Sequence, residues 1–312
     1  MGAPAPFLAQ KTDGDITQFG GVISSDYVRS LVAAIQTKAE LLQDINVDTC
    51  MFQVTPIETV NIGTRISFID TPGTKATSDK EGEPVITPQS FSCKPMRAVI
   101  PITFRQAEDR RNAGDFGEFV KDLAARQIAL DVQEAAIEAD SSNSALIDEL
   151  KQFDGFLAMA GNQIDVSALT TIDSAVFACW QNLPQRYWQA ADAANFRIYM
   201  GHRTWGAYAN EIQNSTVRVH ANLYENPDPR EQVKFFGIPV RSLAMPEGKI
   251  WLTHRMNAMV RFWIQMTYGV DHYENAGVDE HVWRYAHDQK YQEPNGAVVG
   301  DGVAYDVLAT TA

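Results

Sequence analysis

Two segments of alternating polarity, separated by a polar stretch, constrain the fold of this chain more than any other feature. Apolar and polar residues alternate from Thr59 to Phe68 and again from Phe91 to Phe104. A period of two is typical of a strand with one dry and one wet face. Turn-forming residues are frequent between the two segments, from Asp70 to Pro88. The pattern therefore predicts a long two-stranded hairpin.

A hairpin of this length needs support from another surface. About twelve residues of strand extend about 40 Å. An isolated two-stranded ribbon is only marginally stable in water. We therefore expect a second surface beneath the hairpin, and a neighbouring subunit is a natural candidate.

A long helix is predicted directly after the hairpin, from Phe116 to Ala139. Neither proline nor glycine occurs between Glu118 and Asp140, which favours an uninterrupted helix. At about 100° per residue, one line along this helix is apolar; it is formed by Phe119, Leu123, Leu130 and Ile137. An earlier helix is predicted from Asp26 to Leu42. It follows an N-terminal segment that we interpret as an extended arm.

The remainder of the chain divides into two parts by pattern. Helix and strand patterns alternate between Thr170 and Thr253, which predicts an inserted α/β lobe. Longer strand patterns follow and suit an elongated sheet beside the long helix. The predicted elements are lobe helices over 171–189 and 204–212, lobe strands over 196–200, 233–243 and 249–253, and later strands over 256–265, 268–274, 278–292 and 303–308.

Charge and cysteine content exclude several classes of function. The chain has 26 Lys and Arg against 39 Asp and Glu, a net charge of −13, and an acidic protein is repelled by a phosphate backbone. This argues against specific nucleic-acid binding, although not against enclosing a nucleic acid. Cys50, Cys93 and Cys179 lack metal-ligand spacing, which fits reduced thiols in a cytoplasm. The N-terminus shows no signal peptide, and no apolar stretch reaches the ~20 residues of a membrane span.

The sequence predicts no catalytic, cofactor-binding or metal-binding site. It has no Gly-X-Ser-X-Gly elbow, P-loop, His-Glu-X-X-His or dinucleotide-binding glycine motif. His281 and His287, with His272 nearby, come closest to a metal site, but the strand between the first two spans about 20 Å, too far for one zinc ion. We interpret them as polar positions on a long strand, and Cys179 as an inert buried thiol. An aromatic set is interpreted as core and interface packing; it comprises Trp251, Phe262, Trp263, Trp283 and Tyr285.

Four short strings follow one another along the chain. Phe104–Asp109 leads from the hairpin into the long helix, and that helix ends in a Glu-Ala-Ala-Ile-Glu-Ala-Asp run followed by the turn Asp154–Leu157. Gly237–Val240 has the pattern Gly-X-Pro-Val, and Met245–Lys249 contains Pro-X-Gly-Lys. With the hairpin placed before the helix, the chain resembles the Hong Kong 97-type major capsid proteins of tailed bacteriophages over nearly its whole length.

The resemblance implies an α+β fold with named parts. The family combines an N-terminal arm, an extended E-loop hairpin, a peripheral domain with a long spine helix and long strands, and an α/β axial domain. The implied boundaries are 1–50 for the arm and first helix, 51–105 for the E-loop, 106–164 for the peripheral domain with its spine helix, 165–250 for the axial domain, and 251–312 for the return to the peripheral strands and the C-terminus.

The resemblance also implies a structural function in the virion. The chain would be the major capsid protein, not an enzyme, and would self-assemble in the host cytoplasm through pentamers and hexamers. The product would be an icosahedral shell that encloses phage double-stranded DNA without binding it specifically. Implied partners are a portal, a decoration protein and a scaffolding protein, but no membrane. Many relatives carry a scaffolding segment before the arm, whereas here an arm-like region follows Met1 at once. Either the scaffolding protein is a separate chain or the numbering starts at the mature end, and Met1 favours the separate chain.

Seven charged residues are candidate inter-subunit contacts. Five of them suggest a basic arm on an acidic protein: Arg65, Lys75, Lys80, Lys94 and Arg97. An acidic surface of a neighbour would receive this arm, with Glu118 and Asp122 of the spine helix as candidates. In some relatives a lysine at the hairpin tip forms an isopeptide bond, and Lys75 or Lys80 would hold that position here; we favour the alternative that both lysines are simply solvated.

Two other classes of protein remain as alternatives. An encapsulin-type nanocompartment shell shares this fold but encloses cargo enzymes, and it would need a groove for a cargo peptide. The non-helical arm at residues 1–25 fits a phage capsid better. A soluble α+β enzyme is disfavoured, because no catalytic constellation is present and because an arm has little use in a monomer.

Overall fold

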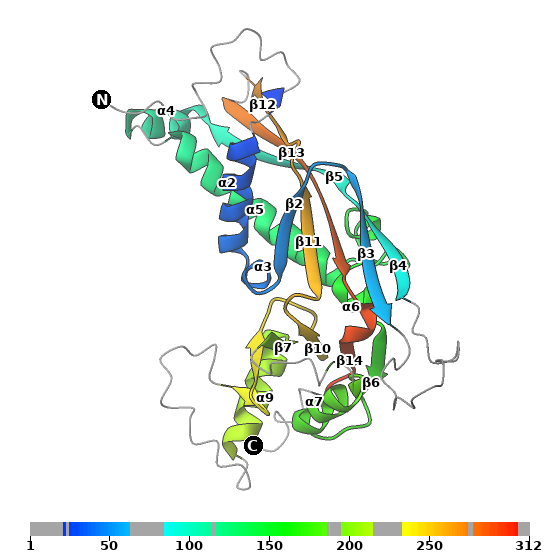
Figure 1. Cartoon of the computed structure of the whole chain (residues 1–312). Helices are drawn as coiled ribbons and strands as arrows, with labels where there is room; N and C mark the ends of the chain where they lie inside the picture. The colour runs from blue at the N-terminus through cyan, green and yellow to red at the C-terminus, as the bar shows by residue number, and fades with distance from the viewer. Residues whose placement is uncertain are drawn as a thin grey trace, which may run out of the picture.

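The molecule is elongated and has two lobes, each built around its own sheet (Figure 1). The computed structural model describes residues 21–22, 25–62, 84–113, 116–185, 187, 195–214, 233–273 and 277–304. A two-stranded ribbon runs along one side of the molecule, from the first lobe toward the second.

The first lobe contains a six-stranded sheet that is organised by one long strand, β13. Strand β12 pairs with the first half of β13 and β11 with the second half, while β5 pairs along its other edge from Thr103 to Lys94. Strands β1 and β2 complete the two ends. The bounds are β1 Gly21–Val22, β2 Asn46–Cys50, β5 Lys94–Thr103, β11 Ala258–Trp263, β12 Thr267–Tyr273 and β13 Val278–Tyr291.

The hairpin exists, but its second strand, Pro84–Ser92, lies earlier in the chain than the predicted 91–104, and residues 84–88 were expected in the turn-rich stretch. Strand β3 (Val54–Ile62) pairs with β4 (Pro84–Ser92). The chain then leaves the hairpin at Cys93, and the rest of the predicted strand is β5, which pairs with β13. Alternating polarity shows which side of a strand is buried, but not which strand lies beside it. For this reason the prediction that residues 94–104 pair with the first hairpin strand was wrong. The predicted continuation of the first strand to Phe68 lies outside the described residues.

Helices cover one face of the first sheet. The predicted early helix is confirmed as α2 (Ser25–Lys38) followed by the short α3 (Glu40–Asp44). Helix α4 (Phe104–Ala113) leads into the predicted spine helix, α5 (Phe116–Glu138). Helix α2 packs directly on α5.

The predicted apolar line on α5 is not the centre of its buried face. Ile137 of that line is buried and Phe119 and Leu123 are half-buried, but Leu130 is 52% exposed. The continuous buried face is formed by Val120, Ala124, Ile128, Val132 and Ala136. At about 100° per residue these buried positions lie on the opposite side of the helix. Small alanine side chains allow α2 and the sheet to approach α5 closely, so size decided the buried face rather than hydrophobicity alone.

The second lobe is the predicted α/β insertion. Its sheet has the strand order β6-β14-β10-β7-β9-β8. Helix α7 packs over β14 and β10, and α9 packs over β9. The bounds are β6 Asn162–Asp165, α7 Ile172–Gln181, β7 Phe196–Met200, α9 His202–Asn214, β8 Lys234–Phe235, β9 Ile238–Ser242, β10 Lys249–His254 and β14 Ala297–Asp301. Short helical turns connect the lobes at Leu150–Gln152, Phe156–Met159 (α6) and Pro294–Gly296, and α6 packs on α5 and β13 of the first lobe.

Two details of this lobe differ from the sequence prediction. The expected strand 233–243 is a hairpin, because Phe236 and Gly237 both adopt positive φ angles, 46° and 84°, and reverse the chain. Strand β14 returns to the second sheet, where it pairs with β10 and β6, although 251–312 was expected to hold only peripheral strands and the C-terminus. Of the expected strand 303–308, Val303 and Ala304 are not in a strand and the rest lies outside the described residues. The other boundaries remain predictions.

Candidate assembly site

The predicted contact residues are scattered over the described structure. Lys94 is half-buried, and its Nζ lies 5.6 Å from the ring centroid of Phe153. Asp122 forms an ion pair of 2.6 Å with Lys38 of the same chain. Arg97 is exposed on β5. Arg65, Lys75 and Lys80 lie outside the described residues, as does the side chain of Glu118.

The strand register changes the expected charge of the hairpin. Lys94 and Arg97 belong to β5 and pair with β13, so they are not part of the ribbon. Residues 54–92 then contain three basic and five acidic residues, a net charge of −2. The acidic residues are Glu58, Asp70, Asp79, Glu81 and Glu83. The ribbon is therefore acidic, not basic as the sequence analysis expected.

The root of the hairpin rests on the chain's own sheet. The Ser92 backbone N–H donates to Asp288 Oδ2 at 2.7 Å, and the Arg261 guanidinium lies 4.7 Å from the ring centroid of the buried Phe91. The thiols of Cys50 and Cys93 meet beside them, with 3.7 Å between their sulfur atoms. Burial, and then the neighbouring Cys50, raises the pKa of the Cys93 thiol. Strands β11 and β13 of the same subunit therefore support the ribbon at its root.

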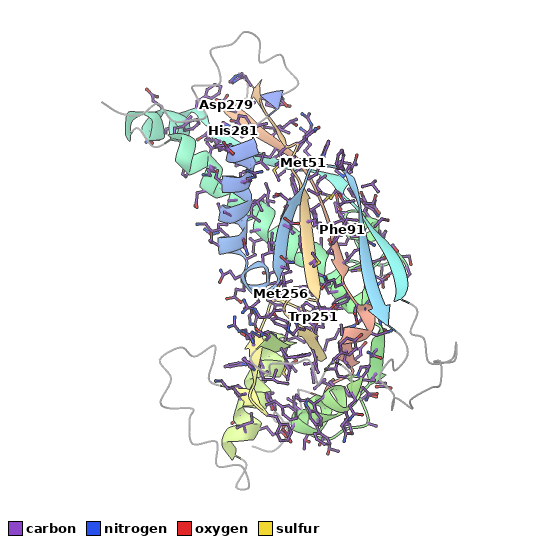
Figure 2. The ribbon with its side chains drawn as sticks, in the orientation of Figure 1. Met51, Phe91, Trp251, Met256, Asp279 and His281 are labelled. Carbon is purple, nitrogen blue, oxygen red and sulfur yellow. The ribbon has the colours of Figure 1, made fainter. Side chains whose placement is uncertain are left out.

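An aromatic cluster joins the two lobes. Trp251 on β10 is fully buried (Figure 2). Its ring centroid lies 4.8 Å from that of Tyr199 on β7 and 5.3 Å from that of Phe156 on α6. Tyr291, at the end of β13, packs against the same Phe156 ring at 5.1 Å and donates its hydroxyl to the Phe156 carbonyl oxygen at 2.8 Å. Aromatic packing of this kind contributes large apolar area and fixed geometry, so the lobes are firmly joined rather than loosely linked.

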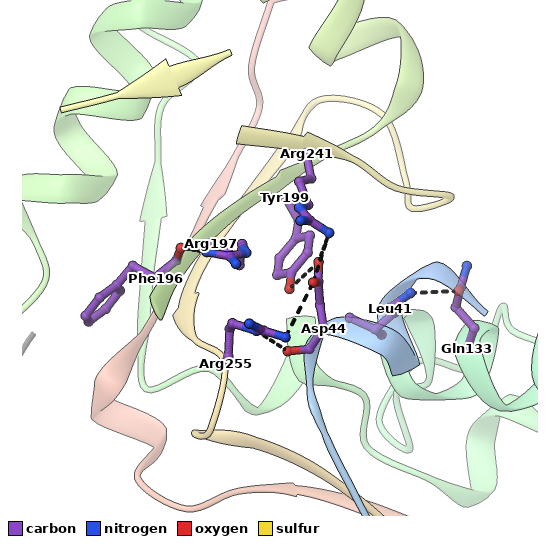
Figure 3. Close-up of polar contacts among 8 residues, drawn as sticks. All are labelled: Leu41, Asp44, Gln133, Phe196, Arg197, Tyr199, Arg241 and Arg255. Carbon is purple, nitrogen blue, oxygen red and sulfur yellow. Dashed lines mark hydrogen bonds and ion pairs between the residues drawn. The ribbon is translucent and has the colours of Figure 1, made fainter. Parts of the chain in front are cut away.

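A carboxylate at the corner between α3 and β2 adds a polar connection to this junction (Figure 3). Asp44 is 6% exposed. The Arg241 Nη1 on β9 donates to both of its carboxylate oxygens, at 2.8 and 2.9 Å, and the Arg255 Nε donates to its backbone oxygen at 2.8 Å. The Tyr199 hydroxyl lies 3.5 Å from the same carboxylate, and burial followed by this negative charge raises the pKa of Tyr199.

Sequence analysis gave no indication of this polar junction, because Asp44 and its arginines lie about 200 positions apart in the chain. A cavity of about 230 Å³ lies beside it. The residues lining the cavity are Glu40, Gln43, Asp44, Tyr199, Trp205, Arg241, Ser242 and Leu243.

The histidines of β13 are more buried than the sequence interpretation assumed. His287 is 0% exposed and stacks on Phe153 with 4.7 Å between ring centroids. Its burial lowers the pKa of His287 to about 3. His281 is also buried and hydrogen-bonds with the Tyr268 hydroxyl, while His272 pairs with Asp279 at 2.7 Å. Among the described residues, no three His, Cys, Asp or Glu side chains form a group that could hold a metal ion.

Two of the family-like strings have clear structural roles. The Gly155 N–H donates to the Ala139 carbonyl oxygen at 2.6 Å and closes the end of the spine helix. A Cβ on Gly155 would lie 2.7 Å from the Ile137 carbonyl oxygen, so only glycine fits. Glu247, in the turn before β10, accepts hydrogen bonds at 3.0 Å from the Arg203 and Thr204 N–H groups at the start of α9. Partial burial of the Glu247 carboxylate favours a higher pKa, but the hydrogen bonds outweigh this effect, so the pKa of Glu247 is lowered.

Comparison with known proteins supports a capsid protein. No protein-family model matches the chain. A relative from Bacillus subtilis, named as a prophage capsid protein, is 22% identical over 258 residues, which covers 78% of this chain and 80% of that protein. The satellite phage P4 procapsid structure, which includes a size determination protein, covers 96% of this chain and 95% of its own, with a TM-score of 0.64 and 12% identity. An encapsulin complex from Synechococcus elongatus covers 98% and 97%, with a TM-score of 0.52 and 10% identity.

These similarities confirm the fold and the resemblance that the sequence predicted. The chain has the α+β fold of Hong Kong 97-type capsid shells. The prophage relative and the procapsid structure together support a phage major capsid protein that forms a shell. A capsid protein has a structural role. In the part of the chain that the structure describes, no helix is long and apolar enough to cross a bilayer.

Proposed function

We propose that this chain is the major capsid protein of a tailed bacteriophage or of a related prophage. It assembles in the host cytoplasm into an icosahedral shell that encloses double-stranded DNA without specific binding. The observation that supports this most strongly is the similarity of nearly the whole chain to a procapsid subunit, together with a prophage capsid relative that matches most of the sequence. The net charge of −13 agrees with a container whose wall does not hold the enclosed polymer.

The two lobes suggest a division of labour in the shell. The second lobe, as the axial domain, would meet its copies around five-fold and six-fold axes to form pentamers and hexamers. The first lobe would form the peripheral contacts, and the hairpin would reach over a neighbour. Each such contact is heterologous, and ring closure limits its growth. A portal, a separate scaffolding protein and a decoration protein are the proposed partners.

Expression of the chain with and without its phage's scaffolding protein tests the proposal. We expect closed shells by negative-stain microscopy of the purified material. Chains that stay monomeric under both conditions would contradict the capsid function.

An encapsulin-type shell is the second candidate, since an encapsulin complex also matches nearly the whole chain. Mass spectrometry of purified particles separates the two. A host enzyme enclosed at a fixed ratio to the shell protein would favour the encapsulin. Particles that package DNA in the presence of a portal and a packaging motor would favour the phage capsid.

A further inference from the structure

Two of the three cysteines meet at the root of the hairpin, although they lie 43 positions apart in the chain. The sulfur atoms of Cys50 and Cys93 are 3.7 Å apart, which is van der Waals contact. A disulfide holds its sulfur atoms at about 2.05 Å. The difference between these two distances is about 1.7 Å. Small rotations of the two side chains are enough to close a gap of this size.

The backbone at both cysteines is held by neighbouring strands. Cys50 ends β2 and lies opposite Trp263 of β11, and its carbonyl oxygen accepts from the Ile264 N–H at 2.9 Å. Cys93 follows β4, and its N–H donates to the Gln53 carbonyl oxygen at 2.9 Å. The Gln53 side-chain amide donates back to the Cys93 carbonyl oxygen at 3.0 Å. The fold therefore fixes the two sulfur atoms beside each other.

The surroundings of the two thiols suit a disulfide as well as a thiol pair. Both side chains are buried in a small cluster of their own. The Cys50 thiol donates to the Phe262 carbonyl oxygen at 3.5 Å, and the Cys93 thiol donates to the Arg261 carbonyl oxygen at 3.8 Å. Since S–H is a weak donor, little hydrogen bonding is given up when both protons leave.

The third cysteine provides an internal comparison. Cys179 lies in the core of the second lobe, whereas Cys50 and Cys93 lie on the first lobe at the hairpin root. Cys179 is buried like the other two, so any difference in its chemistry follows from the lack of a neighbouring thiol and not from exposure.

We propose that Cys50 and Cys93 form an oxidisable pair, which hydrogen peroxide converts into an intrachain disulfide that stabilises the hairpin root. The thiolate of one cysteine attacks an oxygen of the peroxide, and the O–O bond breaks to give a sulfenic acid and hydroxide. The hydroxide takes the proton that this thiol released and becomes water. The second thiol attacks the sulfenic sulfur; the S–S bond forms, the S–O bond breaks, and hydroxide leaves with that thiol's proton as a second water. The two thiols lose two electrons and two protons in all, and the peroxide is reduced to water.

The oxidant has to be small because both thiols are buried. Cys93 is 1% exposed and Cys50 is 7% exposed. Hydrogen peroxide is uncharged and little larger than water, so local opening of the structure admits it more readily than a bulky, charged disulfide reagent. The same burial shields the finished bond from bulky reductants.

The disulfide would join the two ends of the hairpin. Residues 51–92 lie between the two cysteines, so the bond closes a loop that contains both β3 and β4. A cross-link lowers the entropy of the unfolded chain, and the effect grows with the length of the closed loop. A shell is built in a reducing cytoplasm and meets oxidising conditions after release from the cell, so the bond would form where the shell has to last. This consequence rests on the proposed shell function, whereas the thiol chemistry does not.

Peptide mapping of the purified full-length chain tests the pair directly. The chain is treated with hydrogen peroxide, denatured, alkylated and digested without reduction. We expect a peptide that links Cys50 to Cys93, and we expect the thiols titrated in denaturant to fall from three to one. Dithiothreitol should restore all three. An unchanged thiol count, higher oxidation of these cysteines without the linked peptide, or a link that involves Cys179 or a second chain would overturn the proposal.

Thermal melting tests whether the bond stabilises the fold. Peroxide treatment is expected to raise the melting temperature of the unassembled chain by at least about 5 °C, and dithiothreitol is expected to reverse the rise. Cys93→Ala should abolish the rise, and the matched control Cys179→Ala should keep it. No rise in the unaltered chain, a rise that persists in Cys93→Ala, or a rise that is lost in the control would overturn the proposal.

The peptide map is read on the unaltered chain, so it decides the question even where a variant does not fold. All of these measurements use the unassembled protein. Failure of the chain to form shells would therefore count against the capsid function alone, and failure to form the linked peptide would count against the thiol pair alone.

Discussion

His287 makes the stability of the first lobe depend on pH. The imidazole is fully buried against Phe153, and within the described residues neither of its ring nitrogens has a hydrogen-bond partner. Burial penalises the charged form and lowers the pKa of His287 to about 3. In the unfolded chain a histidine has a pKa of about 6.5. The unfolded state therefore binds the proton first, and stability is lost as the pH falls from about 6.5 toward 3.

The size of the effect follows from the gap between the two pKa values. Each pH unit below the unfolded value removes about 1.4 kcal/mol. Between pH 7.5 and pH 5 the folded state should lose about 2 kcal/mol through this one group. Because pH 5 is well above the folded pKa of about 3, the unfolded pKa alone determines that figure. For a lobe of marginal stability this is a large fraction of the total.

His287→Phe removes the titrating group and keeps an aromatic ring beside Phe153 and Tyr285. The larger ring is expected to shift stability by a constant amount of about 1–3 kcal/mol at all pH values. The informative quantity is the difference between the two proteins in the slope of unfolding free energy against pH, because a constant shift does not affect that slope. Urea unfolding of the unassembled chain, followed by tryptophan fluorescence from pH 7.5 to pH 5, should show the variant losing about 2 kcal/mol less than the original. Parallel curves for the two proteins would refute the reasoning. Titration of other groups, including Asp288, whose pKa is raised by burial, is present in both proteins and cancels.

Three further predictions concern the junction and the thiols. Asp44→Asn should lower the free energy of unfolding by about 1–3 kcal/mol, because it leaves Arg241 and Arg255 facing a neutral amide. The control Asp122→Asn, at the exposed ion pair with Lys38, should lower it by less than about 1 kcal/mol. Equal effects of the two substitutions in urea unfolding would contradict the role of the junction. Trp251→Ala should destabilise the chain by about 3–5 kcal/mol through a cavity between the lobes, and a calorimetric melting temperature within a degree of the original would disprove this. Ellman's reagent should react with none of the three thiols until denaturant is added, since all three are buried and burial raises the pKa of Cys179 to about 12; rapid reaction in the native state would show that the thiols are accessible.

The candidate site could be predicted only in part from the sequence. The hairpin, the spine helix and the inserted lobe follow from local periodicity, which depends on each residue's immediate neighbours. Local periodicity does not predict which face of α5 is buried, since the exposed Leu130 is as apolar as the buried residues. The close packing of α2 against α5 determines that the alanine-rich face is the buried one. The charge of the hairpin was misjudged for a similar reason, because Lys94 and Arg97 continue the same alternation after the chain has changed partners at Cys93.

By itself, the sequence determined the class of the protein: an alternating hairpin before a long helix, an inserted α/β lobe, and four strings with the pattern of capsid proteins. These are local features, and each is encoded within a few tens of residues. Only the tertiary structure decided which strands are partners, that the hairpin root rests on the chain's own sheet, and that Asp44 meets Arg241 and Arg255. It also brought the thiols of Cys50 and Cys93 into contact. Such pairings join positions up to about 200 residues apart, and they depend on how the whole chain packs, which no local pattern records.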